Sequence, residues 1–366
     1  MKQIFWLTGS CFFDVDENIV PLMSKQYDIY WFVIRQSDSF YSKEDIEAHM
    51  KRNHVRGEVV DWPRLRSLAS LTMYISLIKD LKKRNPDILY INYPGVPYLF
   101  PLLHVMRFDK SKVIYACHDF ILHVQVKHQK FLQAYANFIL KKFENFQLFS
   151  RTQATLFNQQ FAKKSFYAPL ALKGFGAPSA TAKKDHEKTV FLFFGNIHKR
   201  KGIEYLIEAT NRLAQTYKGQ FIVRIYGDCE NWEEYEKLIT DKECFDLAIR
   251  RVENHEIPDL FASSDYLILP YKEVTQSGPL LISYYYKVPV IASNHDGFKE
   301  YIDHGTTGFL FQNADPQSLS QVMESILRKE YDYSTICKNL SQFIEENNSL
   351  ESIVARYDKG FTQLIK

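Results

Sequence analysis

A polar turn followed by an apolar run is the part of the chain best suited to bind an anion. The turn consists of Thr275, Gln276, Ser277 and Gly278, and Pro279 comes next. Ser277 is a candidate N-cap, and Pro279 suits a first helical turn, where a missing N–H costs nothing. The start of such a helix offers free backbone N–H groups and a positive dipole end, which could seat a diphosphate. The alternative is an ordinary capped helix.

A basic turn is the second candidate for anion binding. Lys201 lies between Gly195 and Gly202, where a strand-like run gives way to a helix-like one. Cations beside a helix start can neutralise the charge of a bound diphosphate. The alternative is a solvated charge in a basic loop. The other polar residues of this turn are Asn196, His198, Lys199 and Arg200.

Two further pairs of residues follow strand-like runs in the first half of the chain. Gly9 and Ser10 end the first apolar run, and His118 and Asp119 follow the run KVIYAC. Parallel α/β sheets bind ligands at the carboxyl ends of their strands, so Gly9 and Ser10 are candidates for ligand binding, and His118 and Asp119 are candidates for catalysis. A histidine titrates near neutral pH and can donate or accept a hydrogen bond there. The alternatives are a loop-capping His–Asp pair and an ordinary glycine turn.

The spacing of the acidic residues and cysteines does not indicate a metal site. Asp14 and Asp16 have DxD spacing, but we expect them to be solvated loop carboxylates rather than Mg²⁺ ligands. The five cysteines are scattered without CxxC spacing, which argues against a zinc site or a disulfide framework and is typical of a reducing cytosol. No metal and no cofactor are therefore expected.

The elements that would position these residues follow a parallel α/β pattern. Short apolar runs alternate with amphipathic stretches, which predicts two Rossmann-like doubly wound domains. We place the first domain at 1–172 and the second at 173–348, and expect a C-terminal helix of about 349–366 that packs back on the first. Residues 171–188 have the composition of an interdomain linker. The expected strands are 4–9, 29–34, 87–92, 112–119, 146–150, 190–196, 221–228, 266–271, 288–293 and 308–311.

Bulk composition limits the class of protein and the kinds of partner that the chain is expected to have. The chain has 366 residues, of which 46% are hydrophobic and 24% charged, and this is typical of a globular protein with about two domains. A net charge of +3 is too small to indicate nucleic acid as a partner. No apolar run approaches the roughly 18 residues that span a bilayer, so we expect a cytoplasmic location.

Four local patterns in the second half occur in a particular order. They are FFGNIHKRKGIEYLIEA, RIYGD, NHEIPDLFASSDYLILPY and the turn at 275–278 with KVPVIAS and GFKEYIDHGTTGFLF. This series resembles the C-terminal domain of GT-B glycosyltransferases of family 4, and NPDILYINYPG and VIYACHDFILHV resemble that family's N-terminal segments. The resemblance covers most of residues 85–330. It implies two domains that face each other across a cleft. It also implies transfer of a sugar from a nucleotide diphosphate sugar with retention of the anomeric configuration, usually without a metal. By analogy, the acceptor would be a saccharide or lipid-linked saccharide of surface polysaccharide biosynthesis.

The family pattern is incomplete in this chain. Lys201 stands at the family's lysine position and His118 at its histidine, but Asn196 replaces the usual arginine. Val274 and Ile282 replace a pair of glutamates, and Glu273 is one place from the first. One hypothesis is an active branch that builds its donor site from residues 273–278. The alternatives are a catalytically silent sugar-nucleotide-binding subunit and a nucleotide-sugar epimerase.

Residues 127–146 mix basic with aromatic and aliphatic side chains. At helical spacing Phe131, Tyr135, Phe138 and Ile139 form one face, with four lysines around it. One interpretation is a helix that packs on the N-terminal sheet. The other is a peripheral contact with an anionic membrane that carries a lipid-linked acceptor. The lysines are Lys127, Lys130, Lys141 and Lys142.

Overall fold

The computed structural model describes residues 1–36, 39, 41–63, 67–118, 129–182, 187–274 and 276–365. The chain divides into two compact units, which are treated separately below. The first unit contains residues 1–171 and 350–366, and the second contains residues 172–349. Both are α/β units built on a parallel sheet, so the predicted fold class is confirmed. In the described part of the chain, no helix has the length and apolar character needed to span a bilayer.

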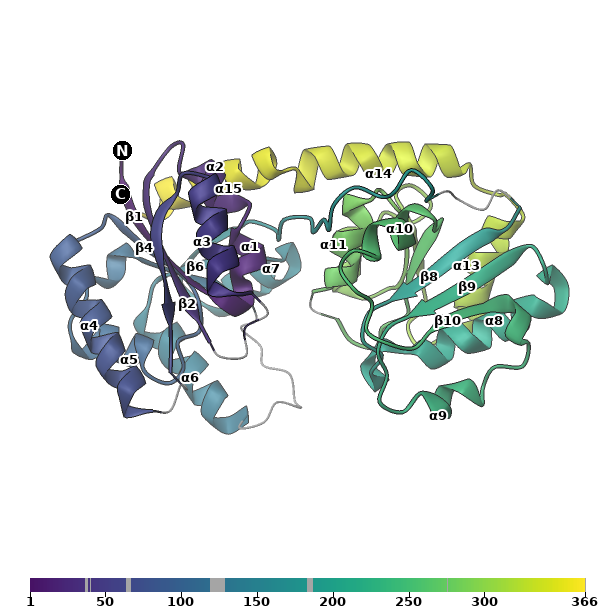
Figure 1. Cartoon of the computed structure of the whole chain (residues 1–366), viewed down its shortest axis with the longest axis horizontal. Helices are drawn as coiled ribbons and strands as arrows, with labels where there is room; N and C mark the ends of the chain where they lie inside the picture. Colours follow the sequence, from purple (N-terminus) through teal and green to yellow (C-terminus); the bar gives the residue numbers. More distant parts are fainter. Residues whose placement is uncertain are drawn as a thin grey trace. The chain divides into compact units, whose positions relative to one another are not determined.

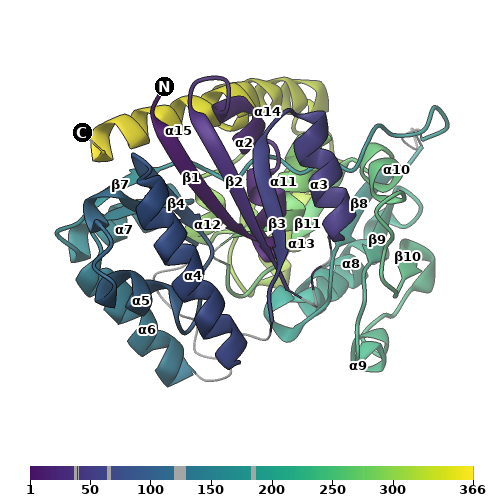
Figure 2. The same cartoon turned by 60° about the vertical axis from the view of Figure 1, so that its left-hand side comes forward.

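A seven-stranded parallel sheet forms the centre of the first unit, in the order β3-β2-β1-β4-β5-β6-β7. Figure 1 labels β1, β2, β4 and β6 of this sheet. The chain moves outward from β1 through β2 to β3, returns to β4, and continues to the other edge. The switch point between β1 and β4 is where such sheets bind ligands. Figure 2 shows β1, β2 and β3 side by side. The strands are β1 Gln3–Gly9, β2 Asp28–Arg35, β3 Arg56–Asp61, β4 Ile88–Asn92, β5 Val113–Cys117, β6 Asn145–Leu148 and β7 Lys164–Tyr167.

Helices cover both faces of this sheet because successive strand residues alternate between them. Trp6 of β1 is buried with α1, α2, α3 and α15, whereas Phe5 and Leu7 are buried with α4, α5, α6 and α7. The C-terminal helix α15 contacts the first sheet through Tyr357, whose ring centroid is 5.7 Å from that of Trp6. The helices are α1 Phe13–Asp16, α2 Ile19–Met23, α3 Lys43–Arg52, α4 Leu68–Arg84, α5 Leu99–Val105, α6 Gln129–Lys142, α7 Arg151–Gln160 and α15 Leu350–Leu364, with 3₁₀ turns η1 Ser10–Phe12 and η2 Lys110–Lys112.

The second unit repeats this plan with a six-stranded sheet in the order β10-β9-β8-β11-β12-β13. Its switch point lies between β8 and β11. The strands are β8 Thr189–Phe194, β9 Phe221–Tyr226, β10 Phe245–Ala248, β11 Tyr266–Leu269, β12 Val290–Ser293 and β13 Phe309–Phe311. The helices are α8 Ile203–Tyr217, α9 Trp232–Glu236, α10 Ile257–Ala262, α11 Gly278–Tyr285, α12 Asp296–Lys299, α13 Pro316–Leu327 and α14 Tyr333–Asn348, with 3₁₀ turns η3 Lys199–Lys201 and η4 Lys242–Cys244.

The stretch expected to be a linker is attached to the second unit over its described part. The Lys173 amide donates to the Leu281 carbonyl at 3.4 Å, and the Phe175 amide donates to the Tyr286 hydroxyl at 3.0 Å. Ser179 donates its hydroxyl to Asp259 at 2.8 Å. Small residues let this backbone lie close to α10 and α11, and the boundary between the two units falls at the start of the stretch, between Ala171 and Leu172.

The basic and aromatic stretch forms α6, which packs on the first sheet through Tyr135 and Ile139. The Tyr135 hydroxyl donates to the Pro94 carbonyl at 2.9 Å. Phe131 points away from this core and is 49% exposed. The packed-helix interpretation therefore describes one side of α6 and leaves a second side open to solvent. Lys127 lies outside the described residues.

Candidate active site

The turn after β8 lies against the start of α11. Gly195 has a φ of 111°, in the left-handed region that favours glycine, and its amide donates to the Tyr226 carbonyl at 3.0 Å. A Cβ on Gly195 would lie 3.5 Å from the Pro279 ring, which is ordinary contact distance. The predicted basic turn and the predicted helix start are thus neighbours. Asn196, next in the chain, is exposed.

Gly202 brings the basic turn onto the end of β11. Its φ is 63°, and a Cβ there would lie 2.0 Å from the Pro270 carbonyl oxygen. The Lys272 amide donates to the Arg200 carbonyl at 2.8 Å and fixes the same approach. Only glycine permits both the conformation and the close contact. His198, Lys199 and Arg200 are exposed, whereas Lys201 is half-buried.

Lys201 directs its ammonium over the ring of Tyr271. The Nζ atom is 3.6 Å from the ring centroid, a cation–π contact. Burial, and then the neighbouring Arg200 guanidinium, lower the pKa of Lys201 to about 7. Among the described residues no carboxylate forms an ion pair with this ammonium. Such a buried cation is suited to receive an anion.

The start of α11 agrees with the sequence prediction. Ser277 is the N-cap, its hydroxyl accepts from the Leu280 amide at 3.4 Å, and Pro279 lies in the first turn. Ser277 is buried and Gly278 is exposed. The Gln276 side-chain nitrogen is buried without a hydrogen-bond partner in the described part of the chain. Thr275 lies outside the described residues.

Tyr271 is a site residue that sequence reasoning missed. Its side chain is 2% exposed, and its hydroxyl has no hydrogen bond of ordinary geometry within the described residues. Burial raises the pKa of this phenol, and the Ser277 side chain, which is within reach of it, opposes the rise. The Tyr271 ring therefore contacts the Lys201 ammonium, and its hydroxyl lies near the Ser277 side chain. Its carbonyl is held by the Ser293 hydroxyl at 2.7 Å and by His295 Nε2 at 3.0 Å.

The positions of the missing glutamates are apolar. Ile282 is 5% exposed in the interior of α11, and Val274 is half-buried. Glu273 is exposed, so the structure does not bring it into the buried part of the site. Hydrogen-bond donors and a cation, rather than carboxylates, thus line the described start of α11.

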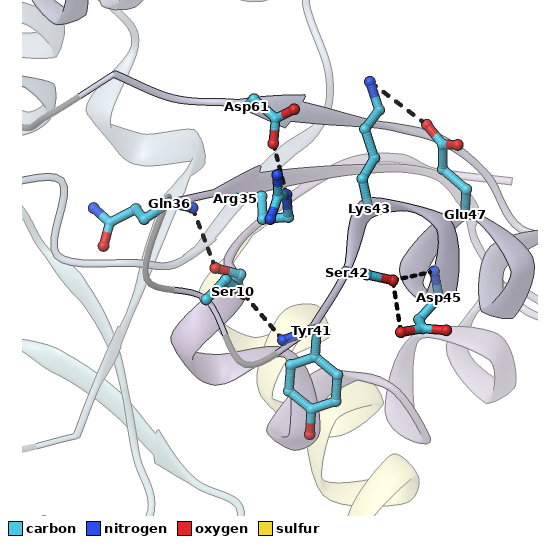
Figure 3. A network of polar contacts seen from close by, with 10 residues as sticks. Ser10, Arg35, Gln36, Tyr41, Ser42, Lys43, Asp45, Glu47 and Asp61 are labelled. Atoms are coloured by element: carbon cyan, nitrogen blue, oxygen red, sulfur yellow. Dashed lines mark hydrogen bonds and ion pairs between the residues drawn. The ribbon is translucent and has the colours of Figure 1, made fainter.

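In the first unit, Gly9 and Ser10 are buried at the end of β1. A Cβ on Gly9 would lie 2.3 Å from the Tyr93 ring, so the glycine makes room for that ring. The Ser10 hydroxyl accepts from the Gln36 amide at 3.5 Å (Figure 3). Their predicted role in donor binding remains a prediction, and their surroundings also give both residues a packing role.

His118 follows β5 and lies between two aromatic rings. Its ring is nearly parallel to Phe12, with centroids 4.0 Å apart, and to Phe149, with centroids 4.2 Å apart. Its Nε2 atom is 2.8 Å from Asn92 Oδ1. Burial lowers the pKa of His118 to about 3, so the ring is neutral at neutral pH. Asp119 lies outside the described residues.

The expectation for Asp16 is wrong. Asp16 belongs to α1, is fully buried, and accepts from Trp6 Nε1 at 3.0 Å and from the Thr8 hydroxyl at 2.6 Å. Burial raises the pKa of this carboxyl to about 7, although these hydrogen bonds oppose the rise. The helix places Asp14 and Asp16 on different faces, so their spacing does not form a metal site. In the described residues no group of three His, Cys, Asp or Glu side chains is arranged to hold a metal ion.

Comparisons with known proteins agree with this geometry. Residues 188–329 match the family described as Glycosyl transferases group 1. An uncharacterised 41.2 kDa protein in the cps region of Klebsiella pneumoniae is 25% identical over 284 residues, which cover 71% of this chain and 75% of that protein. An uncharacterised glycosyltransferase of Methanocaldococcus jannaschii is 25% identical over 53% of this chain and 50% of its own length.

Solved structures extend the likeness to the whole chain. Anabaena HepE, crystallised with UDP and glucose, has a TM-score of 0.72 and 16% identity, and the match covers 99% of this chain and 100% of HepE. At this identity the likeness establishes the fold. The structural likeness confirms the expected GT-B fold of glycosyltransferases for the whole chain, and the family match shows that residues 188–329 form a group 1 glycosyl transferase domain.

Proposed function

We propose that this enzyme moves a sugar from a nucleotide diphosphate sugar to a saccharide or lipid-linked saccharide, with retention at the anomeric carbon. The observation that carries the proposal is the half-buried ammonium of Lys201, which lies over Tyr271 beside the capped start of α11. Buried donors of Tyr271 and Gln276 at the same place have no partner among the described residues. A diphosphate supplies acceptors for all of them.

The chemistry assigned to this site is stabilisation of the leaving group. As the bond from the sugar to the diphosphate breaks, negative charge grows on the phosphate oxygen, and Lys201 neutralises it without a metal ion. The N–H groups of the first turn of α11 receive the other phosphate oxygens. His118 in the first unit is proposed to contact the sugar. Transfer then depends on positioning the acceptor rather than on a strong base.

Donor and acceptor classes are proposed from the relatives. HepE was crystallised with UDP and glucose, so UDP-sugars are the first donors to test. The Klebsiella relative is encoded in a cps region, which favours an acceptor of surface polysaccharide assembly at the cytoplasmic side of the membrane. Both steps are analogies with other proteins.

Calorimetry with a panel of UDP-, GDP-, ADP- and dTDP-sugars tests the donor site. The best donor is then measured against Lys201→Ala, for which we expect affinity to fall about tenfold to a hundredfold, the effect of losing a charge-assisted bond. Lys199→Ala is the matched control, because Lys199 belongs to the same 3₁₀ turn and is exposed. Equal affinity of wild type and Lys201→Ala would exclude the phosphate role.

A catalytically silent binding subunit is the second candidate, and the buried Ile282 favours it. Ile282 stands where the family pattern has a carboxylate, and its burial would make a charged side chain costly at this position. Donor binding without transfer, hydrolysis or isomerisation would favour this candidate. Release of an isomerised sugar without an acceptor would instead identify an epimerase.

Transfer that continues in EDTA would support the metal-free mechanism.

Membrane contact through α6 is also proposed. Lys130, Phe131 and Lys141 are exposed on one side of this helix, and an apolar cavity of about 100 Å³ lies under the other side, between Leu132, Ile139 and Cys117. Vesicles with an anionic lipid should co-sediment the protein, and Phe131→Ser with Lys141→Glu should weaken this binding. Equal binding to neutral vesicles, or equal binding by the variant, would contradict the proposal.

A further inference from the structure

The ring of His118 is held in one plane. Phe12 and Phe149 stack on its two faces, with interplanar angles of 9° and 19°. Phe149 is 1% exposed, so one side of this stack belongs to the core of the first unit. A ring held between two others can present only its edges to a substrate, which makes the identity of the atom at each edge important.

One edge of His118 faces Asn92. The Nε2 atom is 2.8 Å from the side-chain oxygen of Asn92, and a carbonyl oxygen can only accept a hydrogen bond. Nε2 therefore carries the proton as long as the amide keeps this orientation. Asn92 is fully buried at the end of β4, so the surroundings must determine which way its amide points.

Asp16 provides the reason for the amide orientation. Asn92 Nδ2 and Asp16 Oδ1 are both buried without a hydrogen bond of ordinary length, yet Asn92 is close enough to help lower the pKa of Asp16. Asp16 Oδ2 is already occupied by Trp6 and Thr8, which leaves Oδ1 for Asn92. A flipped amide would point its oxygen at the carboxylate, which is repulsive when Asp16 is ionised.

We infer that Asn92 is a positioning residue: oriented by Asp16, it holds His118 as the Nε2–H tautomer and leaves Nδ1 free to accept a hydrogen bond from a sugar hydroxyl. The inference rests on the proposed function for the identity of the substrate. His118 Nδ1 has no partner among the described residues, and the side chain is only half-buried. His118 thus acts as a neutral acceptor, not as a donor or a charged acid.

The tautomer can be measured in the free protein, before any question of activity. Nitrogen-15 NMR of the imidazole groups, with His118 assigned through His118→Gln, should show Nε2 protonated and Nδ1 unprotonated at pH 8. At this pH Asp16, whose pKa is about 7, is mostly ionised. Asn92→Ala should shift the ring toward a mixture of tautomers. A protonated Nδ1 in the wild type, or an unchanged spectrum in the variant, would overturn the inference.

Asn145→Ala is the matched control because Asn145 is also a buried asparagine of the same sheet, at the start of β6. It should alter stability but leave the His118 tautomer unchanged. If Asn92→Ala fails to fold, Asp16→Asn replaces it, since it removes the charge that orients the amide.

We expect kcat to fall about tenfold in Asn92→Ala, with little change in donor binding, as when a supporting partner is lost. An unchanged kcat would also overturn the inference, whereas a wild-type protein that transfers no sugar would overturn the proposed function instead.

Discussion

Lys201 carries its charge in surroundings that disfavour charge. Burial removes water from the ammonium, Arg200 adds repulsion, and the face of Tyr271 compensates only in part. An ordinary core would replace such a lysine or pair it with a carboxylate. Retaining it without an ion pair among the described residues costs stability, and the proposed binding of a phosphate would offset that cost.

Donor affinity should therefore depend on pH through Lys201. Its pKa of about 7 in the free protein should rise when a phosphate binds, because an opposite charge favours the protonated amine. Below pH 7 the lysine is already charged and affinity should be constant. Above pH 7 binding requires proton uptake, so affinity should fall by up to about tenfold per pH unit.

Calorimetry with the best nucleotide diphosphate sugar at pH 6, 7 and 8, in two buffers of different ionisation enthalpy, measures both effects. About half a proton should be taken up at pH 7, as expected for a group at its pKa. Lys201→Arg is the control, because a guanidinium stays protonated over this range and its binding should not follow pH. Constant affinity of the wild type from pH 6 to 8 would contradict the prediction.

Single residues differed in how well the sequence predicted them. Ser277 was predicted as a cap because capping depends on a few neighbours along the chain. Tyr271 and Asp16 were missed or misjudged because their roles come from burial against other elements of the fold. Asp16 accepts hydrogen bonds from Trp6 and Thr8 of β1, which local spacing cannot indicate. For Tyr271 the available signal was its place shortly after the fully buried strand β11.

The turn from β8 into α8 positions Lys201, and Gly202 is the residue on which that turn depends. Substitution by alanine would add the strain of a left-handed φ, about 1–2 kcal/mol, and a clash with the Pro270 carbonyl. We expect Gly202→Ala to lower the free energy of unfolding by more than about 2 kcal/mol and to weaken donor binding. Denaturant unfolding and calorimetry give the two values.

Gly219→Ala is a matched control for this element. Gly219 also has a positive φ, 83°, but a Cβ there would meet nothing within 4 Å, and it lies in the turn between α8 and β9. It should show only the conformational penalty of about 1–2 kcal/mol and normal donor affinity. If the two variants lost the same stability and bound donor equally, Gly202 would have no special role in the site.

Buried strands inside a sheet were predicted more reliably than strands at its edges. All ten expected strands exist, and most lie in the interior of a sheet, where continuous apolar runs are conspicuous. The strands missed were β3, β7 and β10, which lie at sheet edges. In β3, RGEVVD, only Val59 is buried, so its sequence has too little apolar pattern to predict a strand.

The two units use one plan twice. In each, the candidate residues end or follow the strands at the switch point: Ser10 and Asn92 at β1 and β4, and Lys201 and Tyr271 at β8 and β11. Each unit also has its own buried interior, and the first is completed by α15 from the far end of the chain. The chain end is therefore part of the support for His118, although it is distant in sequence.

Loss of the α15 contact should destabilise the first unit selectively. Tyr357 is 1% exposed and its ring centroid is 5.7 Å from Trp6 and 5.9 Å from Phe166. Tyr357→Ala should cost about 3–5 kcal/mol, the usual range for a large buried aromatic. Hydrogen exchange should then rise in β1, β4 and α15 and remain unchanged in β8 and β11. Tyr266→Ala, which removes a buried tyrosine of β11, should give the opposite pattern. A rise in both units with either variant would mean that the two units unfold as one cooperative body. The donor site and the residues around His118 would then be lost in the same unfolding step.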